Sequence, residues 1–291
     1  MAYPKDIVQP LIDINLEAAL QDINIPPRPA ILEHIIAETR KSDPDLNFLT
    51  RLISSDMAVS AGLIKISNSP FFSTQRRVQT IKEALMVLGL LTASRAVACI
   101  SFRHAFPETP VMERFWDSSA KIARLSGWLA QSFASNVLET DEAYTFGLFR
   151  DCGIPLMLVR QPQYQDVLER ANKEPDASFT SVEEMFLPTN HAVVGSMMAR
   201  SWWLNDETTL SILHHHNLGV LDPATSPLSI GNRYRIAIAQ LAEHLLQRQT
   251  TLCNTREWNK LGSACLNVLG LKEEELNEIS EYSMTVIDAD F

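Results

Sequence analysis

The chain has 291 residues, of which 46% are hydrophobic and 21% are charged, and its formal net charge is −10 at pH 7. This profile indicates a globular protein with a sizeable core, in one large domain or two ordinary ones. An acidic surface repels phosphate backbones, so we expect no general nucleic-acid binding. The chain contains only 10 glycines and no Asn-Gly or Asp-Gly pair, which favours helices over hairpins.

The sequence also indicates the cellular compartment in which the protein is expected. The first ten residues lack the apolar core of a signal peptide. The most apolar window, Ala84–Ile100, contains Arg95 and is too short and polar to cross a bilayer. The 4 cysteines show no CxxC spacing, which is typical of reduced thiols. We therefore expect a cytoplasmic protein with no membrane span.

The first third of the chain is predicted to consist of amphipathic helices. A proline-rich entry precedes an apolar stripe over residues 31–36, and Ser42-Asp43-Pro44 ends that helix. Asp56 fits the N-cap of a later helix. Thr80 and Glu83 fit a capping box at the start of another helix, which Gly89 either ends or brings close to a neighbour.

A proline-containing break at Phe106–Arg114 marks the best domain boundary. It divides an N-terminal helical subdomain, 1–108, from a helical core with C-terminal helices, 109–291. We predict a long helix from Phe115 and another over Asp141–Val159. Further helices are expected at about 163–172, 178–186, 190–203, 205–216 and 228–249, with one or two after residue 255. The predicted fold class is all-α.

The stretch "GLFRDCGIPLML" places a charged pair, Arg150-Asp151, inside an apolar run. A buried carboxylate without a partner is costly, so Asp151 should be paired. A histidine at position 150 would form a metal-binding His-Asp dyad, whereas a guanidinium has no lone pair to offer a cation. Arg150 is therefore expected to supply the positive charge that a metal would otherwise supply. The alternative is that Arg150 points outward and Asp151 pairs elsewhere.

Several motifs occur in an order that resembles the HDOD family. They are "INIPPRPAILEHI", "SSDMAVSAGLIKISNSPFF", "TIKEALMVLGL", the Phe115-Trp116 pair, "GLFRDCG", "NHAVVGSMMARSWWL" and "LHHH". The resemblance covers roughly residues 20–250. It implies a multi-helical, HD-domain-like core related to the HD-type metal-dependent phosphohydrolases. It also implies a role in bacterial signalling, with no general enzymatic activity.

The resemblance also implies a relic of the HD metal site. Ser118 stands where the first metal-binding histidine is expected, and Arg150 replaces the second. Asp151 is retained, and the later aspartate falls at Gln240. Of the four metal-ligand positions of the HD-type core, only the one at Asp151 keeps a side chain that can bind a metal. No metal and no catalytic residue are therefore expected.

The more distant HD-GYP phosphodiesterases have further histidine ligands, and His191, His215 and His216 fall at similar places. Successive helical positions point about 100° apart, so at most two of residues 214–216 can face one cavity. A lone histidine before an apolar helix, such as His191, is more often a capping or packing residue than a ligand. If a metal does bind, we expect Asp151, His191, His215 and His216 to hold a divalent iron, manganese or zinc ion.

The leading hypothesis is a non-catalytic signal-transduction module that binds signalling proteins or a small ligand. Its candidate anchors are the aromatic pairs Trp202-Trp203 and Phe71-Phe72. The alternative is a metal-dependent phosphohydrolase of nucleotides or cyclic dinucleotides with an altered site. A third hypothesis is a nucleotide sensor, with phosphate contacts from Arg150, Arg233 and Arg235.

Overall fold

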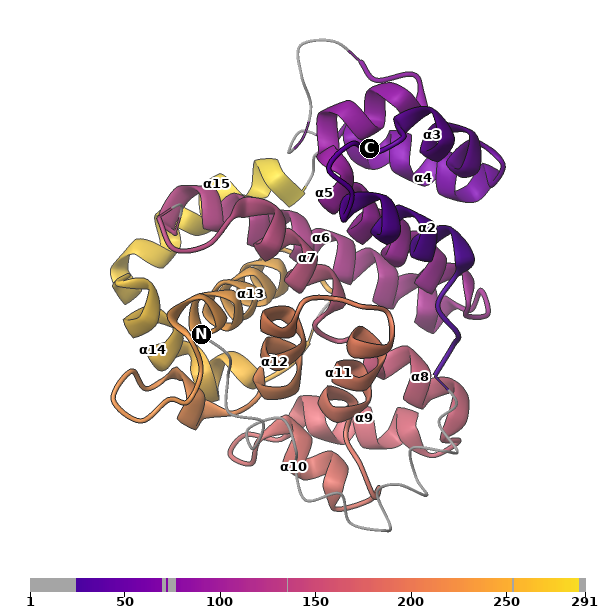
Figure 1. Cartoon of the computed structure of the whole chain (residues 1–291). Coiled ribbons are helices and arrows are strands. Elements are labelled where there is room, and N and C mark those ends of the chain that lie inside the picture. Colours follow the sequence, from indigo (N-terminus) through magenta and orange to yellow (C-terminus); the bar gives the residue numbers. More distant parts are fainter. Residues whose placement is uncertain (1–24, 70–71, 73–76, 135, 253, 288–291) are drawn as a thin grey trace. The chain divides into compact units, whose positions relative to one another are not determined.

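The computed structural model is all-α, as predicted, with no strand among the residues it describes, which are 25–69, 72, 77–134, 136–252 and 254–287 (Figure 1). The contacts between residues group most of the described chain into two compact units. The first is Pro26–Thr109 and the second runs from Pro110 to Ile287.

The first unit consists of helices α2 (Ala30–Thr39), α3 (Leu46–Ser54), α4 (Met57–Ser67) and α5 (Ile81–His104). The predicted helix starts are confirmed. The Asp56 side chain accepts a hydrogen bond from the backbone N–H of Val59, and Thr80 and Glu83 form the capping box. Helix α5 contacts α2, α3 and α4, and buried aliphatic side chains fill the space between them.

Helix α5 changes direction at Gly89, which has φ 70° and ψ 165°. No atom lies within 4 Å of the position that a Cβ would occupy there, so the residue serves the backbone conformation and not a close helix contact. Helix α5 is long and apolar enough to cross a membrane by length and composition alone. The prediction of no membrane span was based only on the shorter window Ala84–Ile100, which is too short and polar to do so. However, 50% of the most apolar stretch of α5 is buried inside the protein, which accounts for the apolar composition.

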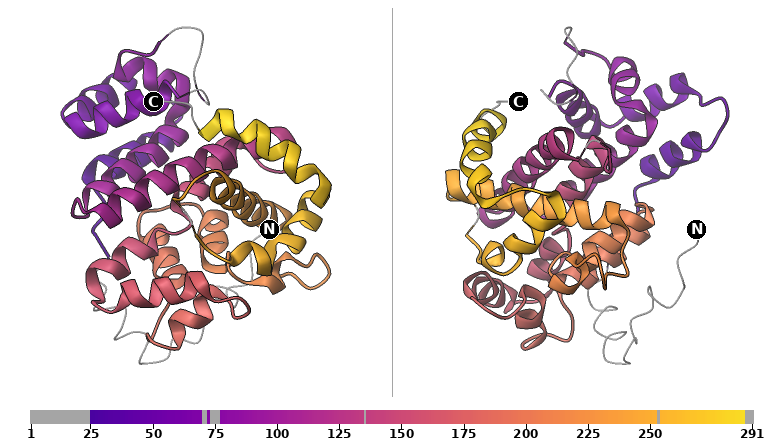
Figure 2. Two further views of the ribbon diagram at one scale, coloured as in Figure 1. Left: turned by 180° about the vertical axis from the view of Figure 1, so that it is seen from behind. Right: turned by 90° about the vertical axis from the view of Figure 1, so that its left-hand side faces the viewer.

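The second unit is built around α13, which lies in the middle of its unit in both views of Figure 2 and contacts α6, α7, α12, α14 and α15. Its elements are α6 (Pro110–Phe133), α7 (Thr140–Phe149), α8 (Gly153–Arg160), α9 (Tyr164–Lys173), α10 (Phe179–Glu184), α11 (His191–Ser201), α12 (Asp206–His214), η2 (Leu218–Leu221), α13 (Ile230–Gln249), α14 (Glu257–Leu269), η3 (Glu273–Glu275) and α15 (Leu276–Ile287).

One predicted helix is wrong. The run Asp141–Val159 was expected to form a single helix, but α7 ends at Phe149 and α8 begins at Gly153. Pro155 lacks the N–H that a continuous helix would donate to the carbonyl of Asp151, so the helix cannot run through this point. The chain turns here instead, and the charged pair Arg150-Asp151 lies at the turn.

The aromatic residues proposed as anchors differ in their exposure to solvent. Trp202 is fully buried in the core, whereas Trp203 has 48% of its surface exposed, with φ at 61°. Phe72 packs against the core of the first unit, and Phe71 lies outside the described residues. Among the described cysteines, Cys99, Cys152 and Cys265 form no disulfide.

Candidate functional site

Four of the predicted site residues converge in the second unit. Asp151 lies at the turn between α7 and α8, His191 is the first residue of α11, and His215 and His216 directly follow α12. One potential ligand atom of each residue lies within 4.8 Å of those of the others. The three imidazoles are buried, and Asp151 is partly exposed.

Local sequence explains how these side chains are placed. Asn190 caps α11 by accepting a hydrogen bond from the N–H of Val193, which fixes His191 in the first turn. Gly153 lets α8 approach the start of α11, because a Cβ there would lie 2.0 Å from the carbonyl oxygen of His191. His214 points away from the cluster into another cavity, so two of the three consecutive histidines face Asp151.

Each imidazole has an acceptor at its Nδ1 atom. The acceptor of His191 is Glu183 Oε2 at 2.8 Å, that of His215 is the carbonyl oxygen of Ile212 at 2.7 Å, and that of His216 is Glu257 Oε2 at 2.5 Å. Carboxylates and carbonyls only accept, so each Nδ1 carries a hydrogen. The Nε2 atoms of the neutral rings are then lone-pair donors.

The three Nε2 atoms face one another and Asp151. His191 Nε2 lies 3.3 Å from that of His215 and 3.2 Å from that of His216. Asp151 Oδ1 lies 3.1 Å from His215 Nε2 and 3.6 Å from His191 Nε2. Four lone-pair atoms therefore surround one small space, which a proton or a metal ion would stabilise. This donor set of three imidazoles and one carboxylate fits a transition metal.

The cluster has strongly shifted titration behaviour. Burial raises the pKa of Asp151, but Arg150 and the side chains of His191 and His215 outweigh burial and hold it well below its ordinary value. Burial lowers the pKa of His191, but the carboxylates of Glu183 and Asp151 raise it to about 10. Burial and the neighbouring His215 lower the pKa of His216 to about 3. Unless another cation takes its place, one proton therefore resides on His191.

The fixed charges around the cluster are unbalanced. Asp151, Glu183, Glu243 and Glu257 are carboxylates in or next to it. Among the described residues, the permanent cations in ion pairs with these carboxylates are Arg150 and Lys260. When all four carboxylates are ionised, two positive charges are missing. A proton on His191 supplies one of them, and a divalent ion would supply both.

Arg150 points inward, and its side chain is 3% exposed. Its Nε donates to Asp151 Oδ2 at 2.9 Å, and its Nη2 forms an ion pair with Glu243 Oε1 at 2.7 Å. Burial raises the pKa of Glu243 despite the guanidinium. Arg150 therefore uses the second oxygen of Asp151, on the opposite side of the carboxylate from the oxygen nearest the histidines.

The remaining predicted positions lie nearby but not among the four converging atoms. Ser118 lines the same cavity as Arg150 and Asp151, and its hydroxyl donates to the carbonyl of Phe115 at 2.9 Å. Gln240 is buried, and its amide donates to the carbonyl of His215 at 3.3 Å. Arg235, proposed for phosphate contacts, forms ion pairs with Glu142 and Glu207 instead.

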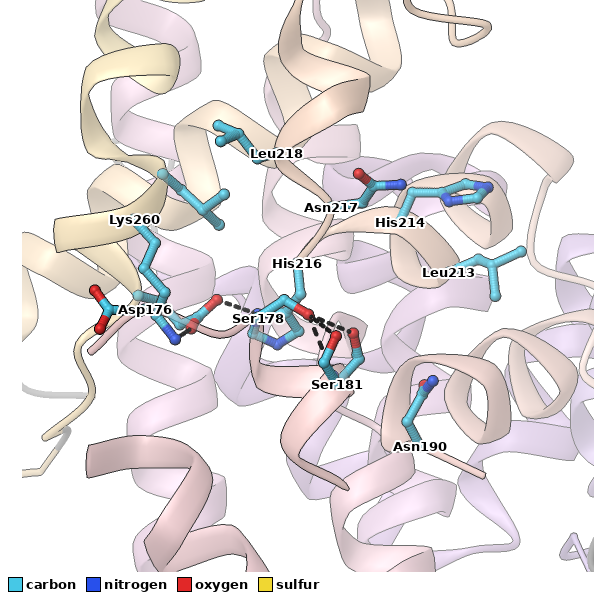
Figure 3. Close-up of a pocket in the computed structure, with 13 residues that line it drawn as sticks. Asp176, Ser178, Ser181, Asn190, Leu213, His214, His216, Asn217, Leu218 and Lys260 are labelled. Atoms are coloured by element: carbon cyan, nitrogen blue, oxygen red, sulfur yellow. Dashed lines mark hydrogen bonds and ion pairs between the residues drawn. The ribbon is translucent and has the colours of Figure 1, made fainter. Parts of the chain in front are cut away.

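Two cavities flank the cluster and share His216 and Glu257 in their walls. The first cavity, of about 310 Å³, reaches Arg150 and Asp151 and has apolar walls that include Phe115, Ile154 and Leu158. The second cavity, of about 470 Å³, is more polar and is lined by His214, Lys260 and the serines near the start of α10 (Figure 3).

Sequence reasoning missed Glu183, Glu243 and Glu257. Glu183 lies in the short helix α10, and its only sequence signal is a glutamate in the apolar context of "SVEEMF". Glu243 lies one turn after Gln240 on α13, and Glu257 begins α14. None of these three has a spacing that points to the histidines, because the contacts arise from tertiary packing.

The chain is similar to several proteins. A protein of unassigned function from Treponema pallidum is 24% identical over 221 residues, which are 75% of this chain but only 43% of that protein. A solved structure of a candidate phosphohydrolase from Shewanella amazonensis SB2B has a TM-score of 0.65 at 20% identity, covering 92% of this chain and 94% of the other. A candidate signal transduction protein from Marinobacter aquaeolei VT8 has a TM-score of 0.68 at 19% identity, covering 94% of this chain and 63% of the other.

These structural likenesses show that the chain shares the all-α fold of those solved structures. The family model of the HDOD domain matches residues 25–218, which is well over half of the chain. The chain therefore belongs to the HDOD domain family.

Proposed function

We propose that this chain is a bacterial, cytoplasmic signal-transduction module that holds one divalent transition metal and does not hydrolyse phosphoesters. The observation that carries the proposal is the convergence of three Nε2 atoms and Asp151 Oδ1, with a hydrogen-bond acceptor behind every Nδ1 atom. This proposal departs from the expectation of no metal and takes up its alternative, with iron, manganese or zinc as the candidate ions.

The ligands of that ion would be Asp151, His191, His215 and His216. When bound, such an ion polarises a coordinated molecule or lowers the pKa of bound water. The protein supplies three buried rings with fixed tautomers and one partly exposed carboxylate. Access from solvent would run past Asp151, through the cavity of about 310 Å³.

Loss of catalysis follows from the groups beside Asp151. A second cation would need the Asp151 Oδ2 atom, which Arg150 occupies. Ser118 and Gln240 are neutral, and both donate to backbone carbonyls. We therefore propose that Arg150 stands in for a second metal ion and keeps the helices in register.

The second candidate function is a phosphohydrolase that works with one metal ion. It is favoured by the open cavity beside the cluster, because one-metal hydrolysis needs only a polarised water and room for a substrate. Against it stands Arg150, whose guanidinium is bound to two carboxylates and is not free to hold a phosphate.

Partners are proposed from the family and from the fold. The similar Marinobacter protein is a candidate signal transduction protein, which supports binding to signalling proteins. We also propose that the chain consists of an N-terminal helical subdomain, residues 1–108, and a metal-binding core with C-terminal helices, residues 109–291. Among the proposed anchors that the structure describes, the exposed Trp203 is the remaining candidate for a contact with a partner.

The test uses the full chain, purified without chelators or affinity metals. Metal content is measured by mass spectrometry, and hydrolysis of bis-p-nitrophenyl phosphate and of cyclic dinucleotides is assayed with added manganese or iron. We expect about one metal ion per chain and no metal-dependent turnover. Turnover that disappears in both Asp151→Asn and His215→Ala, but persists in His214→Ala, would establish the phosphohydrolase instead.

A further inference from the structure

We propose that Glu183 and Glu257 are positioning residues of this metal site, which fix the tautomers of His191 and His216 and adjust the site's charge to a divalent cation. The inference rests on the proposed metal site and assigns a role to two residues outside its ligand set. It also gives a function to part of the chain beyond residue 218, where the family model ends.

Glu183 is held in place by several hydrogen bonds. It is fully buried, and its Oε2 accepts hydrogen bonds from His191 Nδ1 at 2.8 Å and from the His191 backbone N–H at 3.2 Å. Its Oε1 accepts from the hydroxyl of Tyr164 at 2.5 Å. Three donors therefore fix this carboxylate, which can hold the His191 ring in one orientation only.

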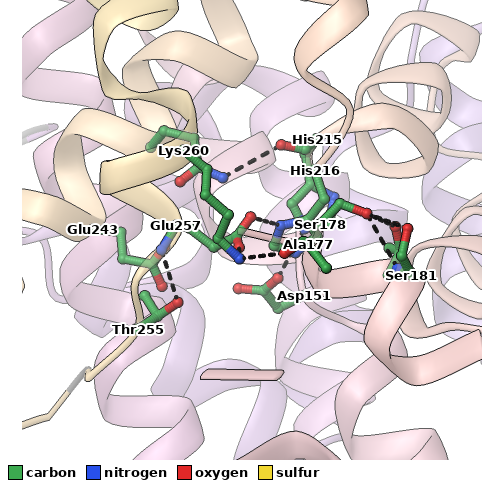
Figure 4. Close-up of polar contacts among 12 residues, drawn as sticks. Asp151, Ala177, Ser178, Ser181, His215, His216, Glu243, Thr255, Glu257 and Lys260 are labelled. Atoms are coloured by element: carbon green, nitrogen blue, oxygen red, sulfur yellow. Dashed lines mark hydrogen bonds and ion pairs between the residues drawn. The ribbon is translucent and has the colours of Figure 1, made fainter. Parts of the chain in front are cut away.

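Glu257 is fixed in a similar way from another element. Its Oε2 accepts from His216 Nδ1 at 2.5 Å, and its Oε1 forms an ion pair with Lys260. Lys260 also donates to the carbonyl oxygen of Ala177 at 2.8 Å, which ties α14 to the loop before α10 (Figure 4).

The third histidine provides an internal comparison. The Nδ1 atom of His215 donates to the carbonyl of Ile212, a neutral acceptor three residues away in the same segment. A neutral carbonyl also fixes a tautomer, so a carboxylate is not needed for orientation alone. The carboxylates at His191 and His216 add negative charge, which raises the basicity of both rings and favours a doubly charged ion.

A purely structural role for the two glutamates makes a different prediction. Buried ion pairs can hold α10 and α14 in place without any effect on a metal beyond general loosening of the fold. Glutamine is similar in size to glutamate and keeps a hydrogen-bond acceptor, but it removes the charge. Glu183→Gln and Glu257→Gln therefore separate the effect of charge from the loss of the contact.

The experiment titrates the metal-free full chain with Co²⁺, followed by its visible d–d absorption and by competition with a chelator. We expect each glutamine variant to bind Co²⁺ about 10- to 100-fold more weakly than the parent, with a shifted absorption band. Glu184→Gln is the matched control, because the neighbouring Glu184 contacts Asn190 and no histidine ring. It should bind Co²⁺ like the parent.

The outcomes separate this inference from the proposed function. A parent chain that binds no Co²⁺ overturns both. Parental affinity and spectrum in both glutamine variants overturn only the positioning role. If the variants fail to fold, ¹⁵N chemical shifts of the histidine rings in the metal-free parent decide: hydrogen on Nδ1 of both His191 and His216 supports the inference, and an Nδ1 without hydrogen in either ring refutes it.

Discussion

Arg150 and Asp151 are adjacent in sequence and also pair with each other, with 2.9 Å between Nε of the arginine and Oδ2 of the aspartate. Neighbouring residues of a straight helix diverge by about 100°, so this contact depends on the turn between α7 and α8. The same turn directs the other carboxylate oxygen of Asp151 toward the histidines. One aspartate therefore serves both a guanidinium and the candidate metal site.

Replacement of Arg150 by methionine should destabilise the fold strongly. The substitution leaves Asp151 and Glu243 without their buried cation, which costs about 3–5 kcal/mol. Urea denaturation of parent and variant, monitored by circular dichroism, measures the difference in the free energy of unfolding.

The control for this prediction is an ion pair at the surface. Lys121 pairs with Asp117 one turn away on α6 at 3.0 Å, and the aspartate is 48% exposed. Lys121→Met should change the free energy of unfolding by about 0–1 kcal/mol. Equal effects of the two substitutions would contradict the structural role assigned to Arg150.

The two neighbouring residues His214 and His215 should differ sharply in their effect on metal binding. His215→Ala removes an Nε2 atom from the cluster, whereas the ring of His214 lines the other cavity. We expect more than about 100-fold weaker Zn²⁺ binding in His215→Ala, because loss of a ligand exceeds the effect of a supporting residue. Isothermal titration calorimetry should give parental affinity for His214→Ala, and equal losses would contradict the assignment.

Gly153→Ala should destabilise the protein by displacing the start of α11. A Cβ at this position meets the His191 carbonyl oxygen at 2.0 Å and the Gly195 nitrogen at 2.8 Å, and both are backbone atoms that cannot rotate away. We expect a loss of about 1–3 kcal/mol or more. Gly231→Ala is the control, since its Cβ has only ordinary contacts and should be neutral or slightly stabilising. Thermal unfolding of both variants measures the contrast, and a neutral Gly153→Ala would be inconsistent with this helix crossing.

His244 should make the fold sensitive to acid. Its ring stacks on Trp258 at 4.4 Å, and burial, followed by the nearby Arg248, lowers its pKa to about 4. Between the ordinary value of about 6.5 and about 4, the unfolded chain binds a proton that the folded chain does not. Stability therefore falls as the pH is lowered through this window, and this group adds nothing further below it.

The variant His244→Phe keeps the stacked ring and removes the proton-binding site. Urea unfolding at pH 7 and at pH 4.5 should show a smaller loss of stability in His244→Phe than in the parent, by less than about 1.4 kcal/mol per pH unit because the ring is partly exposed. His104→Phe, at an exposed position at the end of α5, should behave like the parent. If the free energy of unfolding falls equally between pH 7 and pH 4.5 in His244→Phe and in the parent, His244 does not have this role.

The helices and the caps at Asp56 and Thr80 could be predicted from the sequence, because periodicity and capping depend on residues a few positions apart. The break at Gly153 was missed, since the apolar run hides the effect of Pro155. The histidines were found through the resemblance to a known family. Their partners Glu183 and Glu257 were not, because each lies in a different helix and meets its histidine only after folding.

The most direct test of the central claim is an anomalous-difference map from crystals of the full chain loaded with zinc. We predict one peak per chain, at coordination distance from the Nε2 atoms of His191, His215 and His216 and from Asp151, with Arg150 still paired to Asp151. Two adjacent peaks with Arg150 displaced, or no peak at the cluster, would contradict the account.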